Sequence, residues 1–194
     1  MELIRFGKLD RYELKTLRDD VVTYRHKAAA AGIYGGKFKG IDTGIRDCLT
    51  YFPTVIDHPK TFNILQSQIL QEYYNIGIDI THVSEVQFAQ YHPGNWFKMH
   101  SDVLPARNNR LRGFSLSVNI TNPDEYEGGE LIIQTKNGVI TLDKDPGSFV
   151  VFPSFLKHQA NKVTSGIREA IVCWVHVYTQ ELEKLKVLYN STSI

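Results

Sequence analysis

Three side chains in this sequence have the types and the spacing of metal ligands. His100 and Asp102 stand two positions apart in the segment Phe97–Asp102. Residues two apart on an extended strand point to the same face, so this imidazole and this carboxylate can approach one ion together. His158 follows the apolar run Phe149–Phe152 and is therefore predicted to lie just past a strand. Two histidines and one carboxylate with open coordination positions suit a non-haem Fe(II) that must also bind a co-substrate and O2.

Arg168 is a candidate for binding an anionic ligand beside these residues. It follows His158 by ten positions and stands at the start of the last predicted strand. Its planar guanidinium is always charged and can bind a carboxylate through two parallel hydrogen bonds. The period of two along a strand places Trp174 on the same face as Arg168. The same period, applied to a strand over about 113–121, turns three polar side chains toward the interior, which are Ser115, Ser117 and Asn119. Buried polar side chains need partners, and a bound ligand can be one.

Two amphipathic helices are predicted ahead of the strands, and a short closing helix after them. A capping-box pattern at Asp10 and Glu13 starts the first helix, and Pro59 suits the first turn of the second. In both, apolar residues recur at helical spacing, so each helix must cover an apolar surface. The three predicted helices cover about 10–27, 59–75 and 180–189. The glycine-rich stretch over 32–40 is interpreted as a mobile loop.

From about residue 83 the pattern changes to short β-type runs separated by turn residues. The predicted strands cover about 84–91, 113–121, 130–135, 138–142, 148–152 and 169–178. The step Asn137-Gly138 between two alternating segments is a strong hairpin signal. Many short strands behind two helices predict a mainly β fold with flanking helices. We expect a double-stranded β-helix, or jelly roll, with the N-terminal helices packed on one sheet. No linker divides the chain, which predicts a single domain over 1–194, with helical support over about 1–82 and a jelly-roll core over about 83–178.

The composition excludes several classes of protein. The 194 residues carry 22 basic and 21 acidic side chains, and a net charge of +1 gives no footprint for nucleic acid or an anionic membrane. Cys48 and Cys173 form no CxxC pair, so a zinc knuckle and a thioredoxin-like motif lack support. No apolar run approaches the ~18 residues of a membrane span, and Met1–Lys8 lacks the pattern of a signal peptide. The expectation is a cytoplasmic enzyme or binding module.

A series of motifs follows in order along the second half of the chain. They are Tyr91-x-x-Gly94, His100-x-Asp102, Arg112 before a strand, Tyr126-Glu127-Gly128-Gly129-Glu130-Leu131, Pro146-Gly147, Phe152-Pro153-Ser154, His158, Val163-Thr164-x-Gly166-x-Arg168 and Trp174. With these motifs, the region from about 87 to 177 resembles the 2-oxoglutarate- and Fe(II)-dependent dioxygenases, in the prolyl 4-hydroxylase-like branch. The resemblance covers about half the chain, and several ordered elements make it far more specific than a histidine and an aspartate alone.

The resemblance implies roles for the residues that match. The implied iron ligands, which form the catalytic centre, are His100, Asp102 and His158. Arg168 is implied to pair with the distal carboxylate of 2-oxoglutarate, Tyr91 to reach this co-substrate, and Trp174 to line its pocket. The implied cofactor is Fe(II), with 2-oxoglutarate and O2 as co-substrates and ascorbate as an optional reductant. The implied reaction hydroxylates a prolyl or other amino-acid side chain and releases succinate and CO2. Because imidazoles bind metal when neutral, iron affinity is expected to fall below about pH 6.

Two positions depart from the family pattern. Relatives often carry tyrosine three residues before the first ligand, where this chain has Phe97. Many also place a tyrosine near position 119 to share the carboxylate of the co-substrate, and Asn119 can donate a hydrogen bond there at shorter reach. The branch that demethylates nucleic acids usually carries a second arginine at the position of Trp174, so no nucleic-acid partner is expected. The substrate is a peptide, an amino acid or another small molecule, and the stretches 32–40 and 104–110 are candidate lids over it.

Two hypotheses from other functional classes stay open at this point. A cupin-like metal-dependent hydrolase or isomerase would use the same ligands for Lewis acid chemistry, with zinc activity and indifference to 2-oxoglutarate. A non-catalytic jelly-roll binding module would keep its fold and its ligand after His100→Ala. Arg168 with Gly166 favours the oxygenase, and nothing equivalent in the sequence favours the other two.

Overall fold

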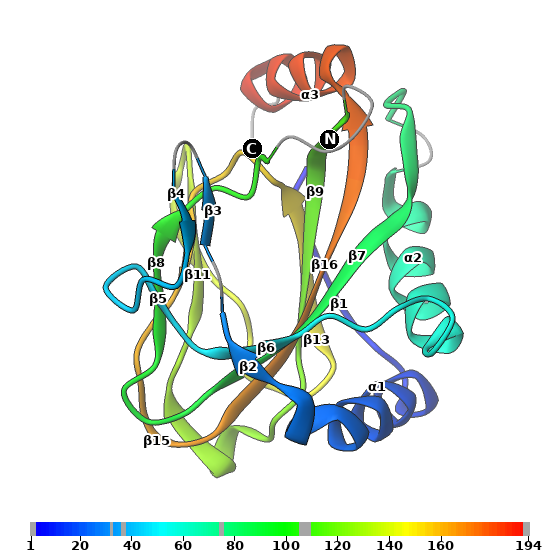
Figure 1. Cartoon of the computed structure of the whole chain (residues 1–194). Helices are drawn as coiled ribbons and strands as arrows, with labels where there is room; N and C mark the ends of the chain where they lie inside the picture. Colours follow the sequence, from blue (N-terminus) through cyan, green and yellow to red (C-terminus); the bar gives the residue numbers. More distant parts are fainter. Residues whose placement is uncertain (1–2, 32, 36–37, 74–75, 105–109, 192–194) are drawn as a thin grey trace.

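Two antiparallel sheets face each other in the computed structural model, which describes residues 3–31, 33–35, 38–73, 76–104 and 110–191 (Figure 1). Within these residues the larger sheet has seven strands, in the order β1 (Arg5–Lys8), β13 (Ser148–Pro153), β9 (Arg110–Asn119), β16 (Arg168–Tyr178), β7 (Ile80–Tyr91), β6 (Leu49–Tyr51) and β2 (Ala29–Ala30). The smaller sheet has five, in the order β12 (Gly138–Thr141), β11 (Leu131–Thr135), β14 (His158–Ala160), β8 (Trp96–His100) and β5 (Arg46–Asp47). Two further sheets have two strands each. One pairs β10 (Tyr126–Gly128) with β15 (Val163–Gly166), and the other is the hairpin of β3 (Ile33–Gly35) and β4 (Phe38–Gly40).

The path of the chain between the sheets confirms the predicted jelly roll. From β7 onward, the principal strands alternate between the two sheets, with β7, β9, β13 and β16 in the larger and β8, β11 and β14 in the smaller. This alternation defines a double-stranded β-helix, in which each sheet turns one face toward the interior. The hairpin of β11 and β12 confirms the signal at Asn137-Gly138, because Thr135 pairs with Gly138 across a two-residue turn.

The three predicted helices are confirmed, with shorter bounds for the first. They are α1 (Arg11–Tyr24), followed by one 3-10 turn over Arg25–Lys27, α2 (Pro59–Tyr73) and α3 (Thr179–Ser191). Asp10 accepts from the Glu13 backbone N–H, and the Glu13 side chain accepts from the Asp10 N–H, so the capping box is formed. No helix in the described part of the chain is long and apolar enough to cross a membrane.

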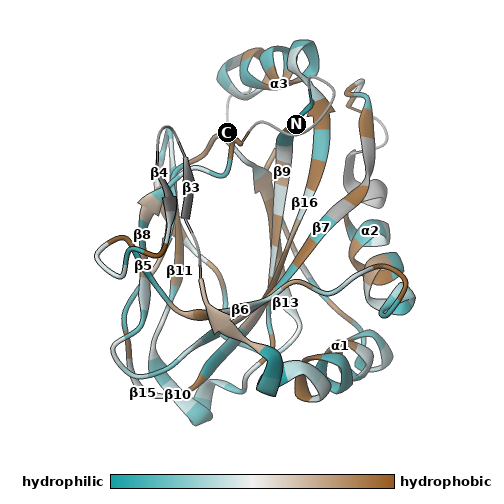
Figure 2. Cartoon of the chain, viewed as in Figure 1, coloured by the Kyte–Doolittle hydropathy of each residue, from teal (hydrophilic) through white to brown (hydrophobic). Residues whose placement is uncertain are grey.

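The helices α1 and α2 cover the outer face of the larger sheet (Figure 1). Both carry hydrophilic and hydrophobic residues, as amphipathic helices do (Figure 2). Leu17 of α1 and Leu65 of α2 are fully buried, in one core with Phe114 and Leu116 of β9 and Ile171 of β16. Each such side chain contributes about 1.5–3 kcal/mol through its burial. This core holds the larger sheet rigid, so that its opposite face can present polar side chains to the interior.

The structure corrects two parts of the sequence-based picture of the N-terminal region. The stretch over 32–40, interpreted as a loop, contains the hairpin of β3 and β4, in which Ile33 pairs with Gly40. The same region supplies four strands that the pattern did not predict, which are β1, β2, β5 and β6. These strands have two to four residues, too few for a period of two to stand out. Of the candidate lid over 104–110, positions 105–109 lie outside the described residues.

Candidate metal centre and co-substrate pocket

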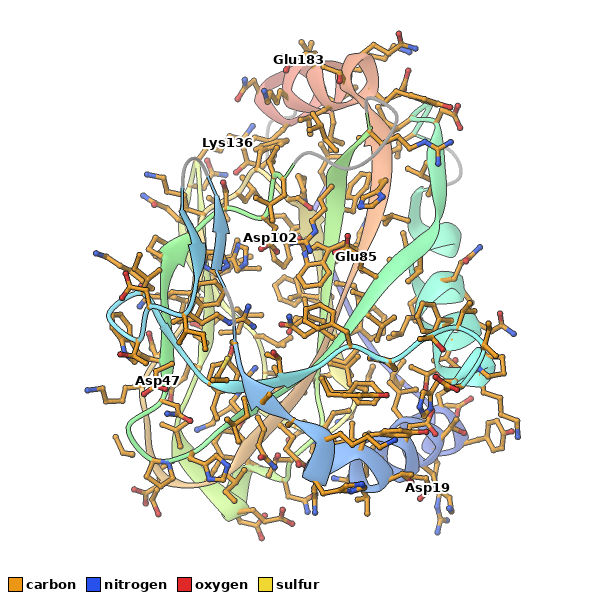
Figure 3. The ribbon with its side chains drawn as sticks, in the orientation of Figure 1. Asp19, Asp47, Glu85, Asp102, Lys136 and Glu183 are labelled. Atoms are coloured by element: carbon orange, nitrogen blue, oxygen red, sulfur yellow. The ribbon has the colours of Figure 1, made fainter. Side chains whose placement is uncertain are left out.

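A cavity of about 400 Å³ lies between the two sheets and contains the predicted chemistry. A volume of this size suits a small-molecule ligand. Figure 3 shows Asp102 in the space between the sheets. The larger sheet contributes Arg168 and Trp174 to the wall, and the smaller sheet contributes His100 and His158. The cavity therefore joins residues from both sheets that are far apart in sequence, such as His100 and Trp174, which are 74 positions apart.

The pairing of β8 with β14 brings the two candidate histidine ligands together. His158 lies directly opposite His100 in the antiparallel register, where side chains of opposing residues are in contact. The centroids of the two imidazole rings are 4.3 Å apart. Asp102 follows β8 by two residues, and its backbone N–H donates to the Ser154 carbonyl oxygen at 2.9 Å. This bond holds the aspartate beside both histidines.

Both imidazoles are oriented by backbone carbonyl groups. Nδ1 of His100 lies 2.7 Å from the Lys98 carbonyl oxygen, and Nδ1 of His158 lies 3.1 Å from that of Leu156. A carbonyl oxygen can accept but not donate, so each Nδ1 carries the proton. The neutral ring then has its lone pair on Nε2, which is the arrangement found in histidines that bind metals. Phe97 stacks on His100 with ring centroids 3.6 Å apart, which fixes the plane of this ring further.

Two side chains of the larger sheet also hold the Asp102 carboxylate. Trp174 Nε1–H donates to Oδ2 at 2.9 Å, and Ser115 Oγ–H donates to the same oxygen at 2.8 Å. Burial acts to raise the pKa of Asp102, but His158 and His100 outweigh it and hold the pKa well below its usual range. The carboxylate is therefore ionised, with Oδ1 turned to His100 at 3.4 Å from Nε2.

The donor set fits Fe(II). One ligand atom from each of His100, Asp102 and His158 can be chosen so that all lie within 4.8 Å of one another. Nε2 of His158 is 3.3 Å from Asp102 Oδ2. Neighbouring ligands at about 2.1 Å from one ion would be about 3 Å apart, so a small adjustment completes the set. Three ligands on one side leave the other positions open to the cavity, which is the ligand arrangement of non-haem Fe(II) oxygenases.

Replacing Trp174 with phenylalanine tests how much the hydrogen bond from Trp174 to Asp102 contributes to metal binding. The substitution removes the Nε1–H donor but keeps an aromatic ring under the Arg112 guanidinium, which lies 3.7 Å from the ring centroid in the native protein. We expect affinity for Fe(II) to fall about 10- to 100-fold, as it does when a ligand loses its supporting hydrogen bond. Anaerobic metal titration measures the change. Trp96→Phe, on the same strand as His100, is the matched control, and an equal loss of affinity in both variants would contradict the role of Trp174.

The metal affinity is expected to depend on pH through His158. Burial acts to lower the pKa of His158, but Asp102 outweighs it and raises the pKa above the usual value for histidine. Burial lowers the pKa of His100. As pH falls, His158 therefore gains a proton on Nε2 first, and a protonated imidazole cannot bind metal. Fe(II) affinity should therefore begin to fall at a pH above about 6.5, the usual pKa of histidine, and should then fall about tenfold per pH unit. Titrations from pH 5 to 8 measure this, and an affinity that stays flat across the range would refute it.

The side chain of Arg168 is buried and lines the same cavity. Its side chain is 3% exposed, and among the described residues no carboxylate or carbonyl forms a hydrogen bond or an ion pair with it. Its guanidinium lies 5.4 Å from the ring centroid of Tyr91, the residue opposite it on β7. Gly129, at φ 68°, provides room for the stem, because a Cβ there would lie 2.9 Å from Arg168 Cδ. A buried charge without a partner in the protein is costly and indicates an anionic ligand.

The structure brings six of the seven predicted site residues to the cavity. Those that line it are Tyr91, His100, Asp102, His158, Arg168 and Trp174. Burial raises the pKa of Tyr91 above its usual value, so its hydroxyl stays protonated and can donate a hydrogen bond. The side chain of Asn119 is directed elsewhere. Its amide donates to the carbonyl oxygens of Lys144 and, at 3.2 Å, Thr121, and it is absent from the described cavity wall.

Arg46 and Gln87 of the cavity wall, which are joined by a hydrogen bond, are among the polar residues that sequence reasoning missed. Arg46 lies on β5, which has two residues, so no periodic pattern points to it. Gln87 lies on β7, where the alternation of buried faces could have identified it as an inward polar residue. Arg112 also lines the cavity, but its charge is matched, because its guanidinium forms an ion pair with Glu85.

The fold and the geometry define a jelly-roll protein with a candidate mononuclear metal centre and a buried arginine beside it in one cavity. Comparison with known proteins narrows this class. Residues 86–176 match the 2OG-Fe(II) oxygenase superfamily. This stretch is just under half of the chain, and over it the sequence is similar to that superfamily. The family description names the metal and the co-substrate that the sequence motifs implied, Fe(II) and 2-oxoglutarate.

Relatives with curated names are PKHD-type hydroxylases. One from Crocosphaera subtropica is 28% identical over 134 residues, which cover 68% of this chain and 59% of the relative. One from a Psychrobacter species is 34% identical over 108 residues, which cover 53% of this chain and 42% of the relative. The chain thus spans about half the length of these two relatives.

Solved structures of prolyl hydroxylases share the fold. A prolyl-4-hydroxylase from Pseudomonas putida has a TM-score of 0.74 at 15% identity and covers 91% of this chain and 94% of its own. A prolyl hydroxylase from Trichoplax adhaerens, in complex with a peptide fragment of the hypoxia inducible factor, has a TM-score of 0.72 at 16% identity and covers 98% and 88%. At such low identity the likeness concerns the fold, and the jelly-roll prediction is confirmed by it.

Proposed function

We propose that this protein is an Fe(II)- and 2-oxoglutarate-dependent dioxygenase that hydroxylates a prolyl or other amino-acid side chain. The observation that carries the proposal is the buried guanidinium of Arg168, which has no carboxylate partner among the described residues and opens into the cavity of the His100, Asp102 and His158 cluster. In the reaction, a C–H bond of the substrate becomes C–OH. One oxygen atom of O2 enters the substrate, and the other enters succinate as 2-oxoglutarate loses CO2.

The chain supplies placement and a dry site for this reaction. Bound Fe(II) would supply the activation of O2, coupled to the oxidation of 2-oxoglutarate. His100, Asp102 and His158 would hold it from one side. Arg168 would bind the distal carboxylate of the co-substrate through two hydrogen bonds, with Tyr91 as a further donor nearby. Apolar side chains of the wall, which include Leu131, Phe152 and Val172, exclude water from the reacting atoms.

The names of the relatives support a substrate class. The sequence relatives are named PKHD-type hydroxylases and the fold neighbours prolyl hydroxylases, which supports an amino-acid side chain, in a peptide or in a free molecule, as the substrate of this protein. Fold alone does not decide between these. We place the protein in the cytoplasm, because Cys48 and Cys173 are both buried and free, and a reducing compartment keeps both thiols and Fe(II) reduced.

An anaerobic visible spectrum tests the proposal. The purified protein is loaded with Fe(II), and 2-oxoglutarate is added without O2. Chelation of the metal by the keto acid produces a charge-transfer band, which we expect to saturate at one 2-oxoglutarate per protein. If Fe(II) is bound and no band develops, the oxygenase function is wrong. Zinc-dependent hydrolysis or isomerisation, or ligand binding without catalysis, would then replace it.

A further inference from the structure

A second buried arginine, Arg46, lines the cavity on the side of the smaller sheet. It is 9% exposed and pairs with Phe97 of β8 through the backbone register of β5. Its guanidinium is held in place by three neighbours. Nη2–H donates to Gln87 Oε1 at 2.5 Å, Nε–H donates to Cys48 Sγ at 3.2 Å, and the guanidinium carbon lies 4.5 Å from the centroid of the Phe97 ring. The group is therefore oriented before any ligand binds.

These neighbours leave most of the donors of Arg46 for a ligand. A guanidinium has five N–H groups, and the bonds to Gln87 and Cys48 use two of them. No polar atom of Arg46 is buried without a partner, so the remaining N–H groups contact the cavity. Neither hydrogen-bonding neighbour is a carboxylate. In the described part of the chain, no ion pair compensates this charge.

The charges in the cavity do not cancel without another anion. Arg112 is matched by Glu85. Among the described residues of the wall, this leaves Arg46 and Arg168 as the cations and Asp102 as the anion. A divalent metal, Asp102, the 2-oxoglutarate dianion and Arg168 would cancel one another in charge. The charge of Arg46 then remains, and a buried cation requires an anionic partner. The co-substrate has two carboxylates, and the metal and Arg168 take both.

We propose that Arg46 binds a carboxylate of the primary substrate and so selects acidic substrates for hydroxylation. This inference rests on the function proposed above and names its substrate class. The carboxylate is either the α-carboxylate of a free amino acid or a carboxylate of a peptide. In both cases the guanidinium offers two parallel N–H groups, the geometry that carboxylates bind best. Arg46 is a specificity residue, and the co-substrate does not depend on it.

Acetate is a probe for this subsite that needs no knowledge of the substrate. The protein is loaded with Mn(II), and the co-substrate site is saturated with N-oxalylglycine, an unreactive analogue of 2-oxoglutarate. Carbon-13 relaxation of labelled acetate is then measured, because Mn(II) accelerates relaxation of nuclei that bind within the same cavity. We expect a saturable acceleration, and we expect Arg46→Gln to require at least tenfold more acetate for the same effect. Arg46→Lys, a point charge without the planar fork, should be intermediate.

Two results would overturn the proposal. One is the absence of saturable relaxation in the unaltered protein, and the other is an equal response in Arg46→Gln, which would mean that acetate binds at the metal. Arg11→Gln, on the exposed face of α1, is the control and should behave as the unaltered protein. Binding of N-oxalylglycine is measured separately in every variant. If the unaltered protein does not bind N-oxalylglycine, the proposed function is wrong. If Arg46→Gln still binds N-oxalylglycine, the variant is folded.

Competition against acetate identifies the source of the carboxylate. Free L-proline carries an α-carboxylate, and N-acetyl-aspartyl-prolinamide carries a side-chain carboxylate with both ends capped. Displacement at lower concentration by L-proline assigns a free amino acid, and displacement at lower concentration by the capped dipeptide assigns a peptide. In either case Arg46→Gln should weaken the better competitor at least tenfold.

Discussion

Replacing Arg168 with methionine is expected to weaken 2-oxoglutarate binding at least a hundredfold while Fe(II) stays bound. The substitution removes two charge-assisted hydrogen bonds, each of which contributes about 1.5–3 kcal/mol, and about 2.7 kcal/mol already corresponds to a hundredfold change. The metal ligands are unaffected, because among the described residues Arg168 makes no hydrogen bond to His100, Asp102 or His158. Titration of 2-oxoglutarate into the anaerobic Fe(II) protein, followed by the charge-transfer band, measures the affinity.

The stability of the protein without ligands distinguishes this role from a structural one. A buried guanidinium without a carboxylate partner costs free energy in the folded state, so Arg168→Met should leave the free energy of unfolding unchanged or raise it. Denaturant unfolding measures this. Arg168→Lys keeps the charge but not the planar fork and should retain part of the affinity. If Arg168→Met binds 2-oxoglutarate as tightly as the unaltered protein, another group binds the distal carboxylate, and Arg46 becomes the first candidate.

The larger sheet could be predicted from sequence because its strands are long enough to show both faces. On β16, Arg168 and Trp174 line the cavity while Ile171 and Cys173 lie in the core, which is the alternation expected for these residue types. Helices α1 and α2 could be predicted for a related reason. An apolar stripe at helical spacing and a capping box determine where a helix lies and what it covers.

The rest of the site depends on contacts between segments that are distant in sequence. Arg46 reaches the cavity because β5 pairs with β8. A strand of two residues is too short for a sequence pattern that would predict this pairing. Asn119 is a residue that the sequence predicts at the site but that the structure places outside the cavity wall. Its inward direction was predicted, but the Lys144 carbonyl takes its amide, and that loop lies 25 positions away. The sequence predicts that Trp174 lines the pocket. Its hydrogen bond to Asp102 joins residues that are 72 positions apart, so the sequence pattern does not predict it.

Replacing Asp102 with asparagine is expected to abolish Fe(II) binding without unfolding the protein. Asparagine has the same shape, and its carbonyl oxygen can take the place of Oδ2, where it accepts from Trp174 and Ser115. The amide nitrogen then takes the place of Oδ1, which faces His100 at 3.4 Å. An amide NH2 group donates hydrogen bonds and has no lone pair for a metal. We expect at least a hundredfold loss of Fe(II) affinity, and with it the loss of the charge-transfer band at any practical concentration of 2-oxoglutarate.

A second aspartate variant shows that the loss comes from the ligand atom and not from its supports. Asp102→Ala removes the acceptor for both Trp174 and Ser115, and each buried donor left without a partner costs about 1–3 kcal/mol. Asp102→Ala should therefore lose metal affinity and stability together, whereas Asp102→Asn should lose metal affinity with stability within about 1 kcal/mol of the unaltered protein. Anaerobic metal titration and denaturant unfolding of both variants separate the two effects. Tight Fe(II) binding by Asp102→Asn would mean that the two histidines and solvent suffice, and that the carboxylate serves to orient them.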